Sequence, residues 1–406
     1  MNPQPAHVRI ETPSRERLRE PAAGGRPSLV IAGASCRAAA ASAAAAGWLV
    51  HAADCFDDLD LGAVAAATHR VRGYPAGVVA AVGAFPAVPW CYTGALENHP
   101  DLVARISAAR PLAGCPPEAV RLVRDPMTLA TLAADAGLTY PDTHASPAGL
   151  PADGTYLRKP RASAGGRGIA PWTDRAAPTA GSAWIWQRHV PGDSLSAVLS
   201  LAGERPRLLG TSRQLVGEAW CRAPAFAFCG AVGTSRDELP AAEVDGLERF
   251  AAVLHAAGLR GLVGVDLVRR AEGLPAVIEV NPRPTASAEL IERATGESFI
   301  AIHLAAFGLR SPRPRPWPVT TAVWSKAILF TSDPLAIDRS LVGRLLDRAA
   351  GWTSADGWPA IADVPRPGQT LRAGGPVLTV FARGDSAPAS LCQLRDRIDG
   401  VRDVTG

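Results

Sequence analysis

Lysine is almost missing from this sequence. Among 406 residues, 42 of them Lys or Arg, the only lysines are Lys159 and Lys326. The formal net charge of +4 is small for this length, so the composition gives no indication of a nucleic-acid partner. Because arginine supplies nearly all the positive charge, each lysine is a candidate for a role that arginine does not fill.

Paired cysteines and long apolar runs are also lacking. The seven cysteines include no CxxC pair, which disfavours a zinc site and favours reduced thiols in a cytoplasmic protein. The most apolar stretch, residues 29–50, is interrupted by Arg37 and centred on Ala and Gly, so no signal or membrane segment is predicted. Residues 1–27 are rich in Pro, Arg and Glu and are predicted to be a disordered lead.

Several familiar active-site motifs are absent as well. The turn at residues 33–37 lacks GxGxxG spacing, so a dinucleotide site there is weakly supported. The glycines at 165–168 follow Lys159 instead of preceding it, unlike a Walker A loop. Ser163 has no evident base nearby, and Lys326 stands in Trp-Ser-Lys-Ala, which is no biotin-acceptor motif. The sequence therefore indicates a site without a protein nucleophile.

The order of predicted elements indicates α/β and α+β architecture in several units. Residues 28–53 alternate strand, helix and strand, which predicts a parallel sheet in an N-terminal α/β domain over residues 28–115. Residues 116–310 mix helices and strands in a second, larger domain. The proline-rich stretch 311–319 is predicted to be an extended linker, and residues 320–406 a small β-rich domain.

The most informative stretch is the apolar strand that begins at Val277, because its polar residues alternate. Glu279, Asn281 and Arg283 share one face of an extended chain. A second apolar strand has Asp266 as its only charge, and a hairpin would bring it beside Glu279. Two carboxylates and an amide suit Mg²⁺ on a polyphosphate, and the arginine fork suits phosphate or carboxylate. An ordinary hairpin with solvated charges is the alternative, which the cost of burying Asp266 disfavours.

A second candidate site begins at Lys159. This lysine ends a predicted strand and is followed by small residues over 161–169, whose amides could approach a phosphate closely. A flexible hairpin loop is the local alternative, and the polar strand downstream favours the phosphate interpretation. The apolar residues around Gln187 could flank a nucleotide base, although on local pattern alone a core strand is favoured.

Taken in order, these segments resemble the ATP-grasp superfamily over residues 29–308. They are most similar to carboxylate–amine ligases and ATP-dependent carboligases related to biotin carboxylase. The resemblance implies an ATP-grasp fold, in which residues 28–115 form the pre-ATP-grasp domain. Residues 116–310 would form two subdomains that clamp ATP.

The resemblance also implies roles for individual residues. Lys159 and Arg283 would be catalytic, with Lys159 contacting ATP and Arg283 stabilising an acyl phosphate and the phosphoryl group in transfer. The implied flap over the phosphates consists of Gly165, Gly166, Arg167 and Gly168. The residues implied to lie along the adenine edge are Gln187, Arg188, His189 and Val190. The implied ribose contact is Asp193. The implied ligands of two Mg²⁺ ions are Asp266, Glu279 and Asn281.

Two positions depart from the family pattern. Many members carry glutamate where this chain has Gln187, and a lysine where it has Arg124, next to the predicted helix start at Asp125. An arginine fork can hold phosphate, but with a geometry that differs from the point charge of lysine.

The implied activity is an ATP-dependent ligase that joins a small-molecule carboxylate, such as glutamate or another amino acid, to an amine. It would act through an acyl phosphate and release ADP and phosphate in cofactor or peptide biosynthesis. The alternatives are an ATP-binding regulatory protein that has lost catalysis and a biotin-carboxylase-like carboligase. No nucleic-acid or membrane partner is expected, and a homo-oligomer is compatible with the sequence.

Overall fold

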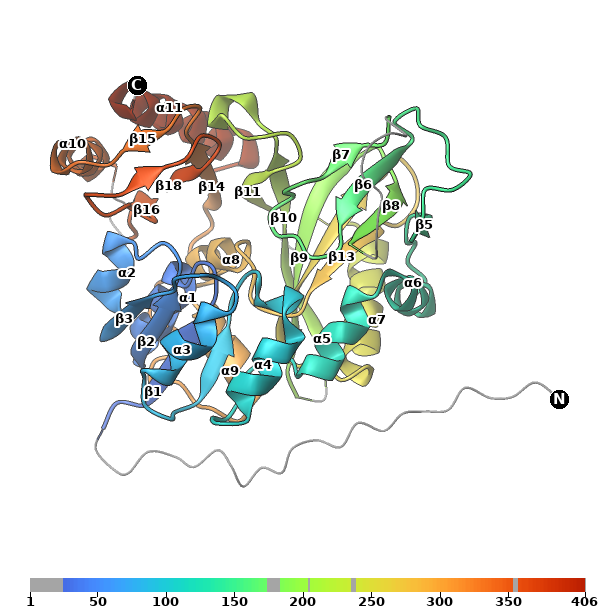
Figure 1. Ribbon diagram of the computed structural model, residues 1–406, viewed down its shortest axis with the longest axis horizontal. Helices are drawn as coiled ribbons and strands as arrows, with labels where there is room; N and C mark the ends of the chain where they lie inside the picture. Colours follow the sequence, from blue (N-terminus) through green and yellow to red (C-terminus); the bar gives the residue numbers. More distant parts are fainter. Residues whose placement is uncertain (1–24, 174–182, 204, 235–238, 353–356, 406) are drawn as a thin grey trace.

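The structure of the chain, a computed structural model, describes residues 25–405 except 174–182, 204, 235–238 and 353–356 (Figure 1). Most of the predicted disordered lead thus lies outside the described residues. No helix in the described part is long and apolar enough to cross a membrane. All seven cysteines are free.

The N-terminal unit is built on a parallel sheet with strand order β3-β2-β1-β4, as the strand–helix–strand pattern predicted. Its strands are β1 (Ser28–Ala32), β2 (Leu49–Asp54), β3 (Ala67–Arg70) and β4 (Trp90–Tyr92). Its helices are α1 (Arg37–Ala45), α2 (Leu59–Val64), α3 (Gly77–Gly83) and α4 (Pro100–Ser107), with a 3-10 turn at Leu96–Asn98. The buried side chains of α1 are mostly alanines, which let the helix lie close to the sheet.

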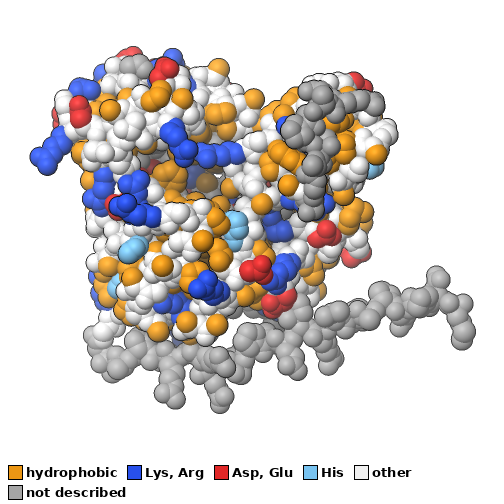
Figure 2. All heavy atoms as spheres, viewed as in Figure 1, with side chains coloured by type: hydrophobic (Ala, Val, Ile, Leu, Met, Phe, Trp, Pro, Cys, Tyr) orange, Lys and Arg blue, Asp and Glu red, His pale blue; other side chains and the backbone are white. Residues whose placement is uncertain are grey.

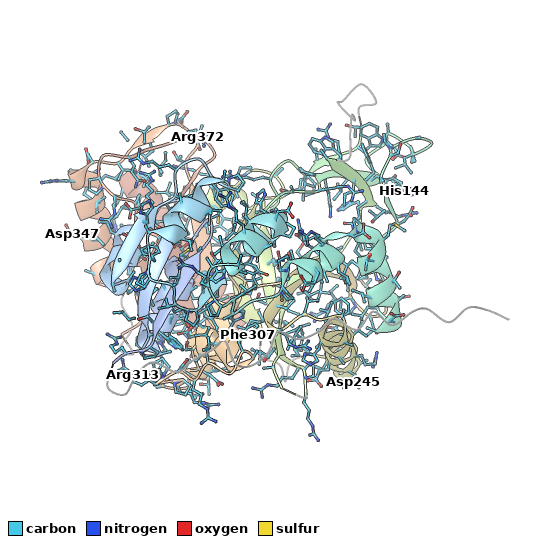
Figure 3. All side chains as sticks on the ribbon, turned by 60° about the horizontal axis from the view of Figure 1, so that its bottom comes forward. His144, Asp245, Phe307, Arg313, Asp347 and Arg372 are labelled. Carbon is cyan, nitrogen blue, oxygen red and sulfur yellow. The ribbon has the colours of Figure 1, made fainter. Side chains whose placement is uncertain are left out.

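A small four-stranded sheet lies at the opposite end of the molecule (Figure 1). It contains β5 (Thr143–His144), β6 (Tyr156–Pro160), β7 (Ala170–Pro171) and β8 (Trp184–Arg188). Helices α5 (Pro117–Arg124) and α6 (Pro126–Asp135) precede it, and Asp125 caps α6 by accepting a hydrogen bond from the Thr128 amide. Figure 3 shows His144 of this sheet on the far side of the molecule from Asp347 and Arg372.

An eight-stranded antiparallel sheet connects the two ends, with strand order β13-β12-β9-β10-β11-β14-β18-β16. Its strands are β9 (Asp193–Leu201), β10 (Arg207–Val216), β11 (Phe228–Thr234), β12 (Gly261–Arg269), β13 (Ala276–Asn281), β14 (Val323–Phe330), β16 (Ile361–Ala362) and β18 (Pro376–Gly384). The helices of this middle part are α7 (Ala241–Ala256), α8 (Ala288–Thr295) and α9 (Phe299–Ala305), with a 3-10 turn at Ala219–Cys221. Leu247 and Phe250 of α7 are buried in the main core, together with Leu199 of β9.

The C-terminal segment extends this sheet, because β14 pairs with β11 and β18 pairs with β14. It also contains two helices that the β-rich interpretation lacked, α10 (Arg339–Ala350) and α11 (Ala387–Thr405). A two-stranded sheet of β15 (Leu335–Ala336) and β17 (Thr370–Leu371) completes it. A single sheet runs through the middle part of the chain and the C-terminal segment. The predicted domain boundaries therefore stay predictions.

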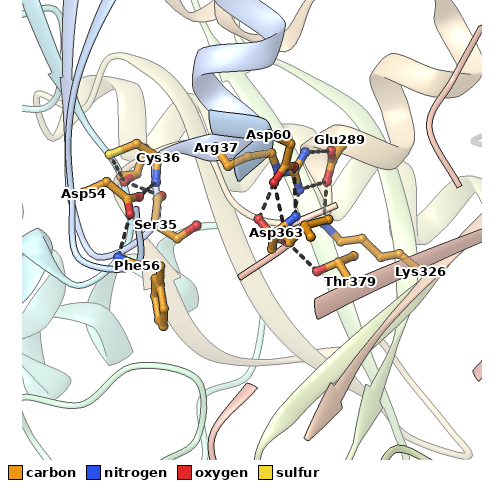
Figure 4. Close-up of polar contacts among 12 residues, drawn as sticks. Ser35, Cys36, Arg37, Asp54, Phe56, Asp60, Glu289, Lys326, Asp363 and Thr379 are labelled. Atoms are coloured by element: carbon orange, nitrogen blue, oxygen red, sulfur yellow. Dashed lines mark hydrogen bonds and ion pairs between the residues drawn. The ribbon is translucent and has the colours of Figure 1, made fainter. Parts of the chain in front are cut away.

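A buried ionic network joins residues from four elements: α1, α8, β14 and the segment after β16 (Figure 4). Arg37 of α1 contacts Glu289 of α8 (Nη1 to Oε1, 2.5 Å) and Asp363 after β16 (Nε to Oδ1, 2.9 Å). Lys326 of β14 reaches the other Glu289 oxygen at 3.0 Å. Burial alone would raise the pKa of Glu289, but Arg37 and Lys326 hold this pKa well below its usual range. One of the two lysines thus belongs to the structural core.

Replacing Arg37 should destabilise the protein markedly. Arg37→Ala leaves Glu289 buried with one cation fewer, and breaking a buried pair costs about 3–5 kcal/mol. Urea unfolding followed by circular dichroism measures the change. Arg121→Ala is the matched control, because Arg121 pairs with Asp101 at the surface (side chains 51% and 90% exposed) and should change little. Equal stability of the two variants would contradict the bridging role.

Candidate active site

The hairpin of β12 and β13 forms as predicted and pairs Asp266 directly with Glu279. Asp266 accepts hydrogen bonds from the side-chain amides of Asn281 (3.0 Å) and Gln214 (2.8 Å). Burial, and after it the negative charge of Glu279, raises the pKa of Asp266 to about 6. Two neighbouring, partly buried carboxylates call for positive charge between or beside them.

These side chains fit a magnesium ion that also binds nucleotide phosphates. Asp266, Glu279 and Asn281 offer the hard oxygen atoms that Mg²⁺ prefers, and Mg²⁺ is commonly held by one or two carboxylates together with phosphate oxygens. In the described part of the chain, no group of three or more His, Cys, Asp or Glu side chains is arranged to hold a metal. The other positions around an octahedral Mg²⁺ would be filled by water and phosphate oxygens.

Lys159 extends from the end of β6 toward the same carboxylates. Its Nζ donates to Oε1 of Gln187 on β8 at 2.5 Å, and Gln187 donates in turn to Thr143 Oγ1 at 3.2 Å. Burial lowers the pKa of Lys159 to about 8, while Glu279 and Asp266 act in the opposite direction. The glutamine that departs from the family pattern thus contacts the lysine through a neutral oxygen.

The glycine loop packs against the start of β11. Gly165 and Gly166 have positive φ (63° and 76°), a conformation that favours glycine. A Cβ on Gly166 would lie 1.8 Å from the carbonyl oxygen of Phe226, and the Phe228 amide donates to the Gly165 carbonyl at 3.2 Å. Only glycine allows this approach at position 166.

A cavity of about 300 Å³ lies between the loop and the β12–β13 hairpin. Its polar lining brings together these predicted residues: Lys159, Gly165, Gly166, Gln187, Asp266, Glu279, Asn281 and Arg283. Apolar walls come from both sides, including Ile185 and Ile278. Such walls around a few converging polar groups are typical of a small-molecule site.

Other predicted residues do not line this cavity: Arg167, Gly168, Arg188, His189, Val190 and Asp193. The side chains of Arg188, His189 and Asp193 are exposed. The contacts assigned to these residues with phosphates, adenine edge and ribose stay predictions.

Arg124 also lines the cavity, from the last turn of α5. It forms an ion pair with Glu279 and donates to Asn98 Oδ1 (2.6 Å) and to the Arg161 carbonyl (3.0 Å). A cation therefore lies close to the predicted metal ligands at the position where the family commonly has a lysine.

The structure adds two residues that sequence reasoning did not assign. Gln214 supports Asp266 from β10, and Glu97, with a side chain 1% exposed, accepts from Nη2 of Arg283 at 2.6 Å. In the stretch between β4 and the 3-10 turn at Leu96–Asn98, and within that turn, Glu97 is the only charged residue. No local pattern indicates that it meets Arg283, 186 residues away.

Residues 124–287 match the family described as ATP-grasp domain. This part of the chain is an ATP-grasp domain. The matched region begins at Arg124 and includes the glycine loop and the β12–β13 hairpin. The predicted resemblance is therefore confirmed for these residues. No curated protein matches the chain.

Solved structures extend the ATP-grasp fold over most of the chain. An N5-carboxyaminoimidazole ribonucleotide synthetase in its ADP complex is similar with a TM-score of 0.65 and 15% identity, covering 93% of this chain and 97% of that one. An L-amino acid ligase from Bacillus licheniformis is similar with a TM-score of 0.66 and 15% identity, covering 93% of this chain and 98% of that one. Biotin carboxylase from Campylobacter jejuni is similar with a TM-score of 0.67 and 12% identity, and the match covers 93% of this chain and 91% of that one. At these identities the likeness concerns the fold, and the predicted ATP-grasp fold is confirmed.

The affinity for ADP should fall as the pH rises through about 8, where Lys159 loses its proton. Below this pKa the ammonium attracts phosphate, and above it the neutral amine does not. Calorimetric titration with ADP between pH 7 and 9 should show a loss of about tenfold, typical of one charged hydrogen bond. Lys159→Arg stays charged throughout and is the control. The same decline in that variant would assign the titration to another group.

Proposed function

We propose that the protein is an ATP-dependent carboxylate–amine ligase that forms an amide through an acyl phosphate. The observation that carries this proposal is the convergence of Lys159, Arg283 and the oxygen ligands Asp266, Glu279 and Asn281 on one cavity beneath a glycine loop. This set can bind and neutralise a polyphosphate and offers no protein nucleophile, which suits transfer between two bound substrates.

The first step joins the acid to phosphate. A carboxylate oxygen of the substrate attacks the γ-phosphorus of ATP, the bond to the bridging oxygen breaks, and ADP leaves with that electron pair. Lys159 and Arg124 pair with phosphate charge, while Asp266, Glu279 and Asn281 would hold Mg²⁺. When bound, the metal neutralises phosphate oxygens. Two ions, as the resemblance implies, belong to this proposal.

The second step forms the amide. The amine nitrogen attacks the acyl carbon, the bond from this carbon to the phosphate oxygen breaks, and phosphate leaves with the electron pair. The nitrogen loses its surplus protons to phosphate and solvent. Arg283 is positioned to stabilise the acyl phosphate, because its fork suits a doubly charged phosphate group.

A regulatory protein without catalysis is the second candidate, motivated by the arginine at position 124. The cavity argues against it, since Arg124 still brings a cation to Glu279. Amino acids are the first acids to test, because one similar structure is of an L-amino acid ligase. A carboxylase-like reaction with bicarbonate is tested by including that anion.

ADP release should require one acid and one amine together. The measurement combines ATP and Mg²⁺ with a panel of acids, including glutamate and bicarbonate, each with and without amines. Release that depends on both partners supports the ligase. Binding of ATP without turnover across the panel would favour the regulatory candidate. No binding of ATP would contradict both.

Glu279→Ala should lower kcat/KM by at least about 100-fold, because a metal ligand at the transferring phosphate is lost. Glu272→Ala is the matched control, since Glu272 is an exposed glutamate in the turn of the same hairpin. Thermal unfolding should show that both variants fold. Unaltered turnover of Glu279→Ala would remove this residue from the metal site.

A further inference from the structure

A crevice lies at the carboxyl end of the N-terminal parallel sheet. All four strands are parallel, but the chain adds β2 and β3 on one side of β1 and β4 on the other side. Ligands of open α/β sheets bind at such a topological switch point, here between β1 and β4. The loops after these strands are linked, because the Ala34 amide donates to the Gly94 carbonyl (2.9 Å) and Thr93 Oγ1 to the Ser35 carbonyl (2.8 Å). Figure 2 shows this face hollowed at its centre, where the N-terminal unit, the C-terminal segment and the large sheet meet.

The crevice adjoins Arg283 of the ATP site. A Cβ on Gly94 would lie 3.5 Å from the guanidinium carbon of Arg283. The next residue, Ala95, has φ of +76°, a conformation that costs an L-residue energy and is commonly found at functional sites. This turn leads into the 3-10 turn that carries Glu97.

Two buried polar atoms near Arg283 lack a hydrogen-bond partner among the described residues. Glu97 Oε1 accepts from Arg283, whereas Oε2 is buried and has no hydrogen-bond partner among the described residues. The hydroxyl of Tyr74 is likewise buried and unpaired in the described part of the chain. Buried polar atoms are rarely left unsatisfied, and an exception commonly marks a ligand or water site.

Tyr74, His99 and Glu97 are neighbours. The rings of Tyr74 and His99 meet edge to face at 5.9 Å. Burial, and then the charge of Glu97, raises the pKa of Tyr74, so its hydroxyl stays protonated. Burial would raise the pKa of Glu97, but Arg283 outweighs it and lowers this pKa, so Glu97 is ionised at neutral pH.

An ionised carboxylate can only accept hydrogen bonds, and a cationic donor satisfies it best. We propose that this crevice binds the amine substrate in its ammonium form, through Oε2 of Glu97 and the hydroxyl of Tyr74. The inference rests on the proposed ligase function and names the substrate class of its second site: a primary amine that is protonated at neutral pH.

The location suits the second step of the reaction. Glu97 is bonded to Arg283, so an amine held by Glu97 lies beside the acyl phosphate that Arg283 stabilises. The ammonium must release a proton to solvent before its nitrogen attacks. Because Arg283 keeps Glu97 ionised, this carboxylate binds the amine and does not retain the proton.

Glu97→Gln tests the proposal, because it keeps an oxygen acceptor for Arg283 and removes the negative charge. Glu118→Gln on the exposed face of α5 is the matched control. With the acid and amine found by ADP release, KM for the amine should rise about tenfold or more in Glu97→Gln, the effect of losing a charged hydrogen bond. Acyl phosphate trapped with hydroxylamine, which is largely uncharged at neutral pH, should yield hydroxamate at the wild-type rate.

Equal loss of amide and hydroxamate in Glu97→Gln would overturn the proposal, since Glu97 would then act only by positioning Arg283. An unchanged KM for the amine would overturn it too. Tyr74→Phe keeps the ring against His99, and it should also raise the amine KM and spare hydroxamate formation, a test that holds even if Glu97→Gln does not fold. Wild-type protein that forms no hydroxamate with any acid would instead refute the ligase function itself.

Discussion

The repulsion between Asp266 and Glu279 is the constraint around which the site is arranged. Like charges opposite one another on neighbouring strands destabilise a sheet, and the Asp266 carboxylate is partly buried. The positive charges of Lys159 and Arg124, which lie beside the two carboxylates, reduce this repulsion. Mg²⁺ and a nucleotide would complete the neutralisation, so substrate binding and relief of the repulsion would occur together.

The two lysines meet different needs. Burial lowers the pKa of both lysines, but Lys159 lines the cavity, whereas Lys326 lies between Glu289 and the ring of Phe381 (5.9 Å). A compact ammonium fits such a space, and the larger planar guanidinium of Arg37 spans Glu289 and Asp363 beside it. Rarity of lysine therefore indicated importance without distinguishing a functional role from a structural one.

The parts of the site that could be predicted from the sequence are those encoded locally. Alternation placed Glu279, Asn281 and Arg283 on one face, and a short turn brought Asp266 opposite Glu279. The contact of Glu97 with Arg283 could not be predicted, because it depends on how two sheets pack. The same holds for the pairing of β14 with β11, since β-pairing over long separations leaves no periodic signal. Helix α10 was missed although Leu341 and Leu345 have helical spacing.

The pairing of β11 with β14 also limits how this protein can be divided. The ATP-grasp match ends at residue 287, yet the strand that covers the free side of β11 comes from residues 323–330. A fragment cut at the end of the match would expose the backbone amides and carbonyls of β11 as an open sheet edge, the kind of surface that templates aggregation. The start of β11 contacts the glycine loop, so the predicted nucleotide site depends, through β11, on a strand that lies beyond the family match.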